Sequence, residues 1–265
     1  MKYKEIFEDN FSIINKESQV VPFILNKIQN KYLLEDSTQK DIILKARQQG
    51  FSSLILAEFA ADFILKDNSR LAIVADISDN AEELLERAKF FIKSYEEKWE
   101  LKVPLKYNSK YEMVNEATNS KYTIGTAENY DFGRSKTITK LHLSEAAFYK
   151  QLNKVLAAAT QAVVPTGKTT IETTANGFNE FKTLWDQAVR GEAGYKPLFY
   201  KASDFYSAEF LEQKKKELGK MFPQEYPETP EEAFLTSGEQ YFDNLMLQEH
   251  LKATQTPMTD GVQYV

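Results

Sequence analysis

Short apolar segments typical of β-strands alternate along this chain with longer segments of helical periodicity, and this order limits the possible folds. We predict strands at 41–45, 71–75, 122–127, 138–143, 168–174 and 196–202, with helices at 22–35, 52–66, 80–99, 151–163 and 179–190. Parallel strands need a long crossover connection, which is usually a helix. The order therefore predicts an α/β fold with a mostly parallel central sheet flanked by helices.

Individual residues mark where some of these elements begin or end. Pro22 suits the first turn of a helix, where its missing N–H needs no partner. Asn80, with Glu83 three residues later, has the spacing of a capping box and predicts a helix start at Asn80. After residue 202 the periodicity weakens, and three prolines within 223–230 predict an irregular connection rather than further sheet.

The composition excludes several kinds of active site. The chain has no cysteine and only two histidines, His142 and His250, which excludes a thiol nucleophile, a zinc–thiolate centre and a histidine-rich metal site. Its net charge of −6 argues against a dedicated DNA-binding module, and the lysines at 214–216 are better explained as a solvated helix face. The amino terminus lacks an apolar signal core, which predicts a soluble, cytoplasmic protein.

Two segments compete as a phosphate-binding loop. AVVPTGKTT, residues 162–170, ends in Gly-Lys-Thr and fits a relaxed form of the phosphate-loop pattern. KARQQGFSS, residues 45–53, fits it less well, because Phe51 stands where the pattern has a lysine. Such a loop works when a strand precedes it and a helix follows, since the amino terminus of the helix then points at the phosphates.

The flanking segments favour KARQQGFSS. It follows the predicted strand 41–45 and precedes a strongly apolar helix, with Gly50 where the backbone must turn. Lys45 or Arg47 could supply the missing positive charge, and the Ser52 hydroxyl could reach Mg²⁺. AVVPTGKTT follows a helix and runs into a β-branched strand, so we interpret it as a Pro-Thr-Gly turn. From the residues alone, KARQQGFSS could also be an exposed basic turn.

KARQQGFSS resembles the deviant Walker A motif of the large terminase subunits of tailed bacteriophages, in which the lysine can stand at the start of the loop. Other segments resemble that family in the same order. PFILNKIQ places Gln29 where the family has a glutamine that reads the adenine, and ITKLHLSEAAFY places Ser144-Glu145 at the end of a Walker B strand. ETTANG, residues 172–177, matches the coupling motif, and PETPEEAFLTSGEQYFD resembles the end of the ATPase domain. Together the matches span roughly residues 20–245.

The resemblance implies a P-loop NTPase of the ASCE/RecA-like type that binds ATP and Mg²⁺ and hydrolyses the nucleotide. It implies that Glu145 orients or deprotonates the attacking water and that Arg134 is an arginine finger acting on a neighbouring subunit. The implied metal-binding residues are Ser52, Ser144 and Glu145. The implied nucleotide-binding residues are Gln29, Lys45, Ala46, Arg47, Gln48, Gln49, Gly50, Phe51, Ser52, Ser53, Thr174 and Asn176.

Two positions depart from the family pattern. Ser144 replaces the usual Walker B aspartate, so a neutral hydroxyl stands where a carboxylate would help to hold Mg²⁺. Phe51 replaces the usual lysine. Simple structural roles also remain open: Glu145 near a helix start, Arg134 in a surface ion pair, and the Asn-Gly of ETTANG in a turn.

The resemblance further implies a motor that moves viral double-stranded DNA into a procapsid in the host cytoplasm, with no membrane involved. The implied partners are the DNA, a portal protein and a small terminase subunit, with a homo-oligomeric ring on the portal and a monomer as an alternative in isolation. We predict an ATPase core at 1–230 and a lid or linker at 231–265. The family's RNase H type nuclease domain has no room in 265 residues, so the chain resembles the ATPase domain without a nuclease site.

Two other functions fit parts of the sequence. A helicase-like DNA translocase shares the expected fold but should carry a second motor domain, which we do not find in the sequence. A nucleotide-binding assembly module without hydrolysis would fit the changes at Phe51 and Ser144. Nucleotide turnover would distinguish this module from the motor.

Overall fold

The computed structural model describes residues 2–129, 131–134 and 136–235. Its centre is an eight-stranded sheet with the strand order β10-β3-β9-β8-β4-β7-β6-β5. The parallel strands are β3 (Lys40–Lys45), β4 (Arg70–Ala75), β7 (Ser120–Thr126), β8 (Ile138–Ser144), β9 (Val163–Thr173) and β10 (Lys196–Tyr200). At the β7 edge, β6 (Glu112–Asn115) and β5 (Leu105–Asn108) continue the sheet as an antiparallel hairpin, which the sequence did not lead us to expect.

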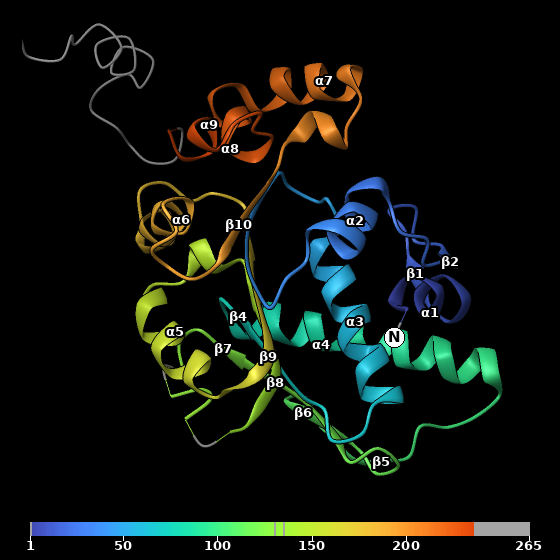
Figure 1. Cartoon of the computed structure of the whole chain (residues 1–265). Coiled ribbons are helices and arrows are strands. Elements are labelled where there is room, and N and C mark those ends of the chain that lie inside the picture. The colour runs from blue at the N-terminus through green and yellow to red at the C-terminus, as the bar shows by residue number, and fades with distance from the viewer. Residues whose placement is uncertain (1, 130, 135, 236–265) are drawn as a thin grey trace, which may run out of the picture.

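Helices cover both faces of the sheet, as Figure 1 shows. α3 (Phe51–Leu65) and α4 (Ser78–Trp99) lie on one face together with α1 (Tyr3–Asn10), and their apolar side chains form one core cluster. α5 (Leu152–Gln161) and α6 (Glu180–Val189) form the second cluster on the other face. The predicted fold class, a mostly parallel sheet flanked by helices, is confirmed. Among the described helices, none is both long enough and apolar enough to cross a membrane.

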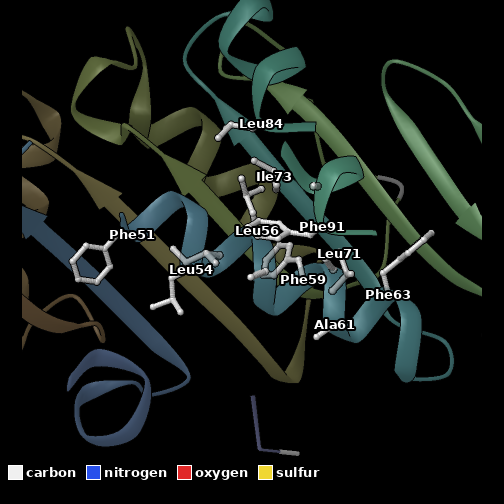
Figure 2. Packing of buried hydrophobic residues seen from close by; sticks show 14 of the residues in the cluster. Phe51, Leu54, Leu56, Phe59, Ala61, Phe63, Leu71, Ile73, Leu84 and Phe91 are labelled. Carbon is white, nitrogen blue, oxygen red and sulfur yellow. The ribbon is translucent and has the colours of Figure 1, made fainter. Parts of the chain in front are cut away.

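Helix α3 is apolar around most of its circumference, and most of its side chains are buried. Figure 2 shows Leu56 and Phe59 of α3 close to Ile73 of β4 and Phe91 of α4. A helix without a polar face is stable only when it is buried, and α3 packs against the sheet as well as α1 and α4. This packing fixes the direction of the α3 axis and therefore the position of its amino terminus at Phe51.

Two carboxylates on α3, Glu58 and Asp62, are buried but paired. Lys140 Nζ of β8 lies 2.6 Å from Glu58 Oε1 and 2.7 Å from Asp62 Oδ2. Lys168 Nζ of β9 lies 3.2 Å from Glu58 Oε2, and the Tyr3 hydroxyl donates a 2.6 Å hydrogen bond to Asp62. Burial by itself would raise the pKa of Glu58, but the charges of Lys140 and Lys168 outweigh it and lower that pKa to about 2.

Residues 163–170 of the segment AVVPTGKTT belong to β9, and the predicted Pro-Thr-Gly turn is wrong. β9 begins at Val163, and its pairing with β8 shifts from Ile138–Val163 to Lys140–Lys168, so the residues between them bulge out of the sheet. Gly167 lies in this bulge, where a Cβ would come within 2.6 Å of Val163 Cγ1. Lys168 is thus part of a bulged strand rather than of a loop that precedes a helix.

The predicted helix start at Pro22 is wrong. The elements in this region are β1 (Ser12–Ile14), β2 (Val20–Pro22), α2 (Lys27–Lys31) and a π-helical turn (Tyr32–Asp36). Pro22 ends a strand, and α2 begins after Asn26. The Asn26 side chain accepts a hydrogen bond from the Gln29 N–H, while the Gln29 side chain accepts one from the Asn26 N–H. This capping box stabilises a later helix start.

The predicted capping box at Asn80 is also wrong. α4 begins at Ser78, and Ile77 stands at the cap position without any side-chain hydrogen bond. Asn80 lies inside the first turn, where its side-chain amide donates a 2.6 Å hydrogen bond to Asp76 Oδ1. The side chain therefore reaches back to the end of β4 instead of capping its own helix.

After β10 the described chain forms three α-helices, α7 (Ala208–Leu218), α8 (Phe222–Glu225) and α9 (Pro230–Leu235), and no further strand. The predicted irregular connection around the three prolines is wrong in part, because α8 and α9 lie within it. Figure 1 shows them, in orange, beyond one end of the sheet. Lys215 and Lys216 are exposed on α7, as expected for a solvated helix face, while Lys214 is half-buried over the Phe210 ring and pairs with Glu217. The predicted division at residue 230 stays a prediction, because residues 236–265 lie outside the described part of the chain.

Candidate functional site

The loop between β3 and α3 joins the end of a strand to the start of a helix through a tight turn. It leaves the sheet after Lys45 and ends at Phe51, the first residue of α3. Gln48 and Gly50 both have positive φ angles, 58° and 83°, which turn the chain back over the end of its strand. A Cβ at Gly50 would lie 2.7 Å from Gln29 Nε2, so glycine is needed here for space as well as for conformation.

Neighbouring elements hold this loop by its backbone carbonyls. Gln29 Nε2 donates a 2.8 Å hydrogen bond to the Gly50 carbonyl, and Asn26 Nδ2 donates one of 3.1 Å to the Gln49 carbonyl. The Tyr206 hydroxyl donates a 2.7 Å hydrogen bond to the Arg47 carbonyl. Gln29, predicted to contact adenine, is buried, and its amide is used within the protein to position the loop.

A cleft of about 380 Å³ opens between this loop, the ends of β4 and β8, and the first turns of α4. Because these strands are parallel, their carboxyl ends meet at one edge of the sheet. Lys45, Ser144, Glu145 and the loop 47–53 are thereby brought together. The lining residues are Lys45, Arg47, Gln48, Gln49, Gly50, Phe51, Ser52, Ser53, Ala75, Asp76, Asn80, Glu83, Leu84, Arg87, Ser144 and Glu145.

Lys45 stands on the floor of the cleft between two carboxylates. Its Nζ lies 3.1 Å from Glu145 Oε1 and 3.1 Å from Glu172 Oε2. Burial alone would lower the pKa of Lys45, but the two negative charges outweigh it and raise that pKa above its ordinary value. Lys45 is therefore a fixed positive charge at the point where the loop begins.

Glu172 is the central residue of the site that sequence reasoning missed. It lies on β9, fully buried, and its Oε1 accepts hydrogen bonds from Ser52 at 2.9 Å and from Ser144 at 2.8 Å. His142 Nε2 lies 3.2 Å from the same oxygen. Burial would raise the pKa of Glu172, yet the Lys45 charge and the hydrogen bonds from His142 and Ser144 lower it well below its ordinary range. The available signal was a glutamate inside the apolar and β-branched run of β9.

Glu145 has an unusual backbone conformation. Its φ of 54° and ψ of 46° place a non-glycine residue in the left-handed region directly after β8. Such residues are uncommon and concentrate at functional sites. The side chain is 35% exposed, and its Oε2 accepts 3.2 Å hydrogen bonds from the Thr174 N–H and from the Thr173 hydroxyl. One carboxylate oxygen therefore faces Lys45 while the other is held by Thr173 and Thr174.

The remaining predicted nucleotide residues lie beside the cleft rather than in its lining. Thr174 reaches Glu145 through its backbone N–H. Asn176 Nδ2 donates a 3.3 Å hydrogen bond to the Ala147 carbonyl, in the turn that follows Glu145. Ala46 is buried, and its N–H donates to the Tyr200 carbonyl of β10 at 3.1 Å. These contacts join the coupling motif to Glu145 and the loop to β10.

Sequence reasoning also missed the wall that α4 contributes. Asn80, Glu83 and Arg87 of α4 line the cleft, with Asp76 just before the helix, and Arg87 forms an ion pair with Glu83 one turn earlier on the helix. An arginine in this position could bind phosphate oxygens, because its guanidinium can form two parallel hydrogen bonds. Its spacing from Glu83 is an ordinary surface pattern, so the sequence carried no signal for this position.

Arg134 does not lie with the other site residues of its own chain. Its side chain is 73% exposed and pairs with Asp131 at 2.9 Å. It borders a separate cavity of about 440 Å³, whose other lining residues include Lys136 and Lys154 of α5. Within one chain, Arg134 therefore contributes nothing to the cleft around Lys45.

Comparison with known proteins identifies the fold. No protein-family profile and no curated protein sequence matches the chain. The ATPase domain of the large terminase of Thermus phage P74-26 matches with a TM-score of 0.57 and 16% identity, over 76% of this chain and 92% of that domain. The large terminase of bacteriophage HK97 matches with a TM-score of 0.63 and 15% identity, over 83% of this chain and 52% of that protein.

This chain has the fold of a large terminase ATPase domain. A third match is the large terminase of another thermophilic bacteriophage, solved in complex with ATP-gamma-S, with a TM-score of 0.56 and 12% identity, over 75% of this chain and 51% of that protein. This likeness agrees with the predicted fold class, a mostly parallel sheet flanked by helices. The chain spans about half the length of the HK97 terminase and of the terminase solved with ATP-gamma-S.

Proposed function

We propose that this chain is a Mg²⁺-dependent ATPase that supplies the energy for packaging viral double-stranded DNA. One observation supports the proposal above all others: Lys45, Ser52 and Glu145 converge on one cleft, although they come from a strand end, a helix start and a second strand end. A cation, a hydroxyl and a carboxylate are the groups that phosphoryl transfer to water requires around the nucleotide.

Residues 48–50 of the loop and the first turn of α3 would hold the phosphates, since the N–H groups of Ala46 and Arg47 already donate to the Tyr200 and Glu225 carbonyls. The first N–H groups of a helix have no partners within the helix, and the helix dipole adds partial positive charge at that end. Lys45 lies on the cleft floor, and Arg47 and Arg87 line its sides. One terminase that shares this fold, from a thermophilic bacteriophage, has been solved with ATP-gamma-S and with ADP. The same class of ligand fits the charges of this cleft.

The residues around Ser52 fit a magnesium ion. The Ser52 hydroxyl donates a hydrogen bond to Glu172, which leaves its oxygen lone pairs free for a cation. Mg²⁺ keeps several water ligands and binds substrate phosphates, so it needs only one or two oxygens from the protein. Bound beside Ser52, with Ser144 and Glu145 nearby, Mg²⁺ would neutralise charge on the transferred phosphoryl group.

Glu145 would orient the attacking water and accept its proton. The hydrogen bonds from Thr173 and Thr174 restrain one carboxylate oxygen, while the other is exposed to the cleft beside Lys45. Thr174 contacts Glu145, and Asn176 contacts the turn 146–149 that follows it. We propose that a shift of the Glu145 carboxylate on hydrolysis moves this turn through these two residues and so couples hydrolysis to movement. Arg134, exposed on its own chain, would complete the site of a neighbouring subunit.

The proposed assembly is a homo-oligomeric ring on a portal protein in the host cytoplasm, working on double-stranded DNA together with a small terminase subunit. The exposed position of Arg134 supports a ring, since an arginine that acts on a neighbour must project from the surface. A helicase-like translocase remains the alternative within the same fold; the described residues hold a single sheet of the motor type.

A nucleotide-binding assembly module without hydrolysis is the second candidate. Phe51 favours it, because this side chain packs in the core against Tyr200, with ring centroids 4.8 Å apart, and cannot replace the lysine of a usual loop. Turnover decides between the two candidates. The motor releases many phosphates per chain, whereas the module binds ATP and releases none.

Phosphate release by the wild-type chain, measured with Mg²⁺ and DNA over a range of protein concentrations, tests the proposal. We expect Glu145→Gln to abolish release while leaving nucleotide binding intact. Glu192→Gln, which changes an exposed carboxylate paired with Arg190, is the matched control and should keep full activity. Equal phosphate release by the wild type and the Glu145 variant would refute the assignment of Glu145, and absence of nucleotide binding would refute the site.

A further inference from the structure

Residue 144 poses a problem for the proposed magnesium site. In P-loop NTPases the hydroxyl of the loop and a carboxylate at the end of the Walker B strand hold the ion together. Here the β8 strand ends in Ser144, which carries no charge. Ser52 would therefore lack the carboxylate that normally fixes its hydroxyl, unless another strand supplies one.

The neighbouring strand does supply one. Glu172 is paired with Ser144 in the register of β9 and β8, so the two side chains stand next to each other at the same level of the sheet. Both Ser144 and Ser52 donate hydrogen bonds to Glu172 Oε1, at 2.8 and 2.9 Å. One carboxylate oxygen thus joins the end of β8 to the start of α3.

The length of the side chain explains how this exchange is possible. An aspartate on β8 would have to reach the loop hydroxyl from its own strand. Glutamate is one methylene longer, and from β9, which lies between β3 and β8, it reaches both hydroxyls. The serine at 144 leaves the space that the Glu172 carboxylate occupies, and it satisfies that carboxylate with a hydrogen bond.

We infer that Glu172 replaces the missing Walker B carboxylate: it orients the Ser52 hydroxyl toward Mg²⁺ and supplies the negative charge behind the ion. This inference rests on the proposed nucleotide site. Glu172 is a positioning residue, because its Oε1 acts through Ser52 and its Oε2 faces Lys45. The residue pair Ser144 and Glu172 would then be functionally equivalent to an aspartate at 144 with an uncharged partner at 172.

A competing role for Glu172 is that of a counterion for Lys45 alone. In that role the Glu172 carboxylate would matter for folding and for the position of Lys45. Its loss would then weaken nucleotide binding by the same factor with Mg²⁺ and without it. The two roles predict different dependence of nucleotide affinity on Mg²⁺. They also differ in whether a carboxylate at position 144 can compensate, since an aspartate there would sit near Ser52.

The test measures the Kd of a fluorescent ADP with saturating Mg²⁺ and with EDTA, for the wild type, Glu172→Gln, Ser144→Asp and the double variant. We expect Glu172→Gln to weaken Mg²⁺-dependent binding at least tenfold while changing binding in EDTA less than threefold. Ser144→Asp alone should also weaken Mg²⁺-dependent binding, because it places a second carboxylate against Glu172. The double variant should recover affinity to within about threefold of the wild type.

Several outcomes would overturn the inference. Equal loss of affinity with Mg²⁺ and in EDTA would assign Glu172 to Lys45 alone, and failure of the double variant to recover would exclude an exchange between positions 144 and 172. If Glu172→Gln does not fold, Glu172→Asp keeps the charge but withdraws it by one methylene and should show the same selective loss of Mg²⁺-dependent binding. A wild-type chain that binds no nucleotide would instead refute the proposed site itself.

Discussion

Lys45 Nζ lies 3.1 Å from Glu145 Oε1, although the two residues are 100 positions apart in the chain. The contact joins the end of β3 to the end of β8 across the intervening strand β9. It places the positive charge that the loop lacks at position 51 next to the carboxylate that we assign to the attacking water.

This contact predicts opposite behaviour for two lysines that each pair with a buried glutamate. Lys45→Ala should weaken ATP binding at least tenfold, because it removes the cation on the cleft floor. Lys168→Ala should leave ATP affinity within about twofold and lower the stability instead, since Glu58 loses one of its two partners. Nucleotide titration and urea unfolding of both variants measure the two effects. A larger loss of ATP affinity in the Lys168 variant would reverse the choice of loop.

The contrast between these lysines also shows what the sequence could reveal. The strand before Lys45 and the apolar helix after Ser53 are local patterns, and they identified the loop despite its poor match to the motif. Glu172 could not be assigned in this way, because its role depends on the register between β8 and β9, which is set by long-range pairing. The β9 bulge misled the interpretation of AVVPTGKTT, since Pro and Gly signal turns and bulges equally well.

Arg87 should contribute to nucleotide binding even though the sequence did not single it out. We expect Arg87→Ala to weaken ATP binding about tenfold, the scale of one lost charge-assisted hydrogen bond, and to affect ADP less if the guanidinium meets the terminal phosphate. Lys93→Ala is the control, because Lys93 lies on the same helix, pairs with Glu97 and does not line the cleft. Competition titrations with ATP and ADP distinguish the two contributions. Equal affinities for the Arg87 variant and the wild type would remove Arg87 from the site.

Glu58 predicts a specific loss of stability in acid. Its pKa is lowered to about 2 in the folded chain, below the usual value near 4.5, so the folded state favours the ionised form. The resulting stabilisation is present above pH 4.5 and is lost as the pH falls toward 2. From this group alone, the free energy of unfolding should fall by about 2 kcal/mol between about pH 5 and pH 3. Glu58→Gln should be less stable at neutral pH and should lack this part of the decline in urea unfolding curves.

Arg134 is predicted to act on the neighbouring subunit, because it is exposed and does not line the cleft of its own chain. Arg134→Ala should lower the rate of ATP hydrolysis by about 10³-fold while leaving ATP affinity nearly unchanged. Arg190→Ala, which removes another exposed arginine paired with a neighbouring carboxylate, is the matched control and should hydrolyse ATP normally.

Mixing two inactive variants tests the trans arrangement directly. Glu145→Gln chains keep Arg134, and Arg134→Ala chains keep Glu145, so a mixed assembly contains interfaces in which both residues are intact. We expect hydrolysis to reappear on mixing and to rise more steeply than linearly with protein concentration, because each active site needs two chains. If Arg134 forms only a surface ion pair with Asp131, its loss should change stability by about 0–1 kcal/mol, and the Arg134 variant should be fully active without any partner.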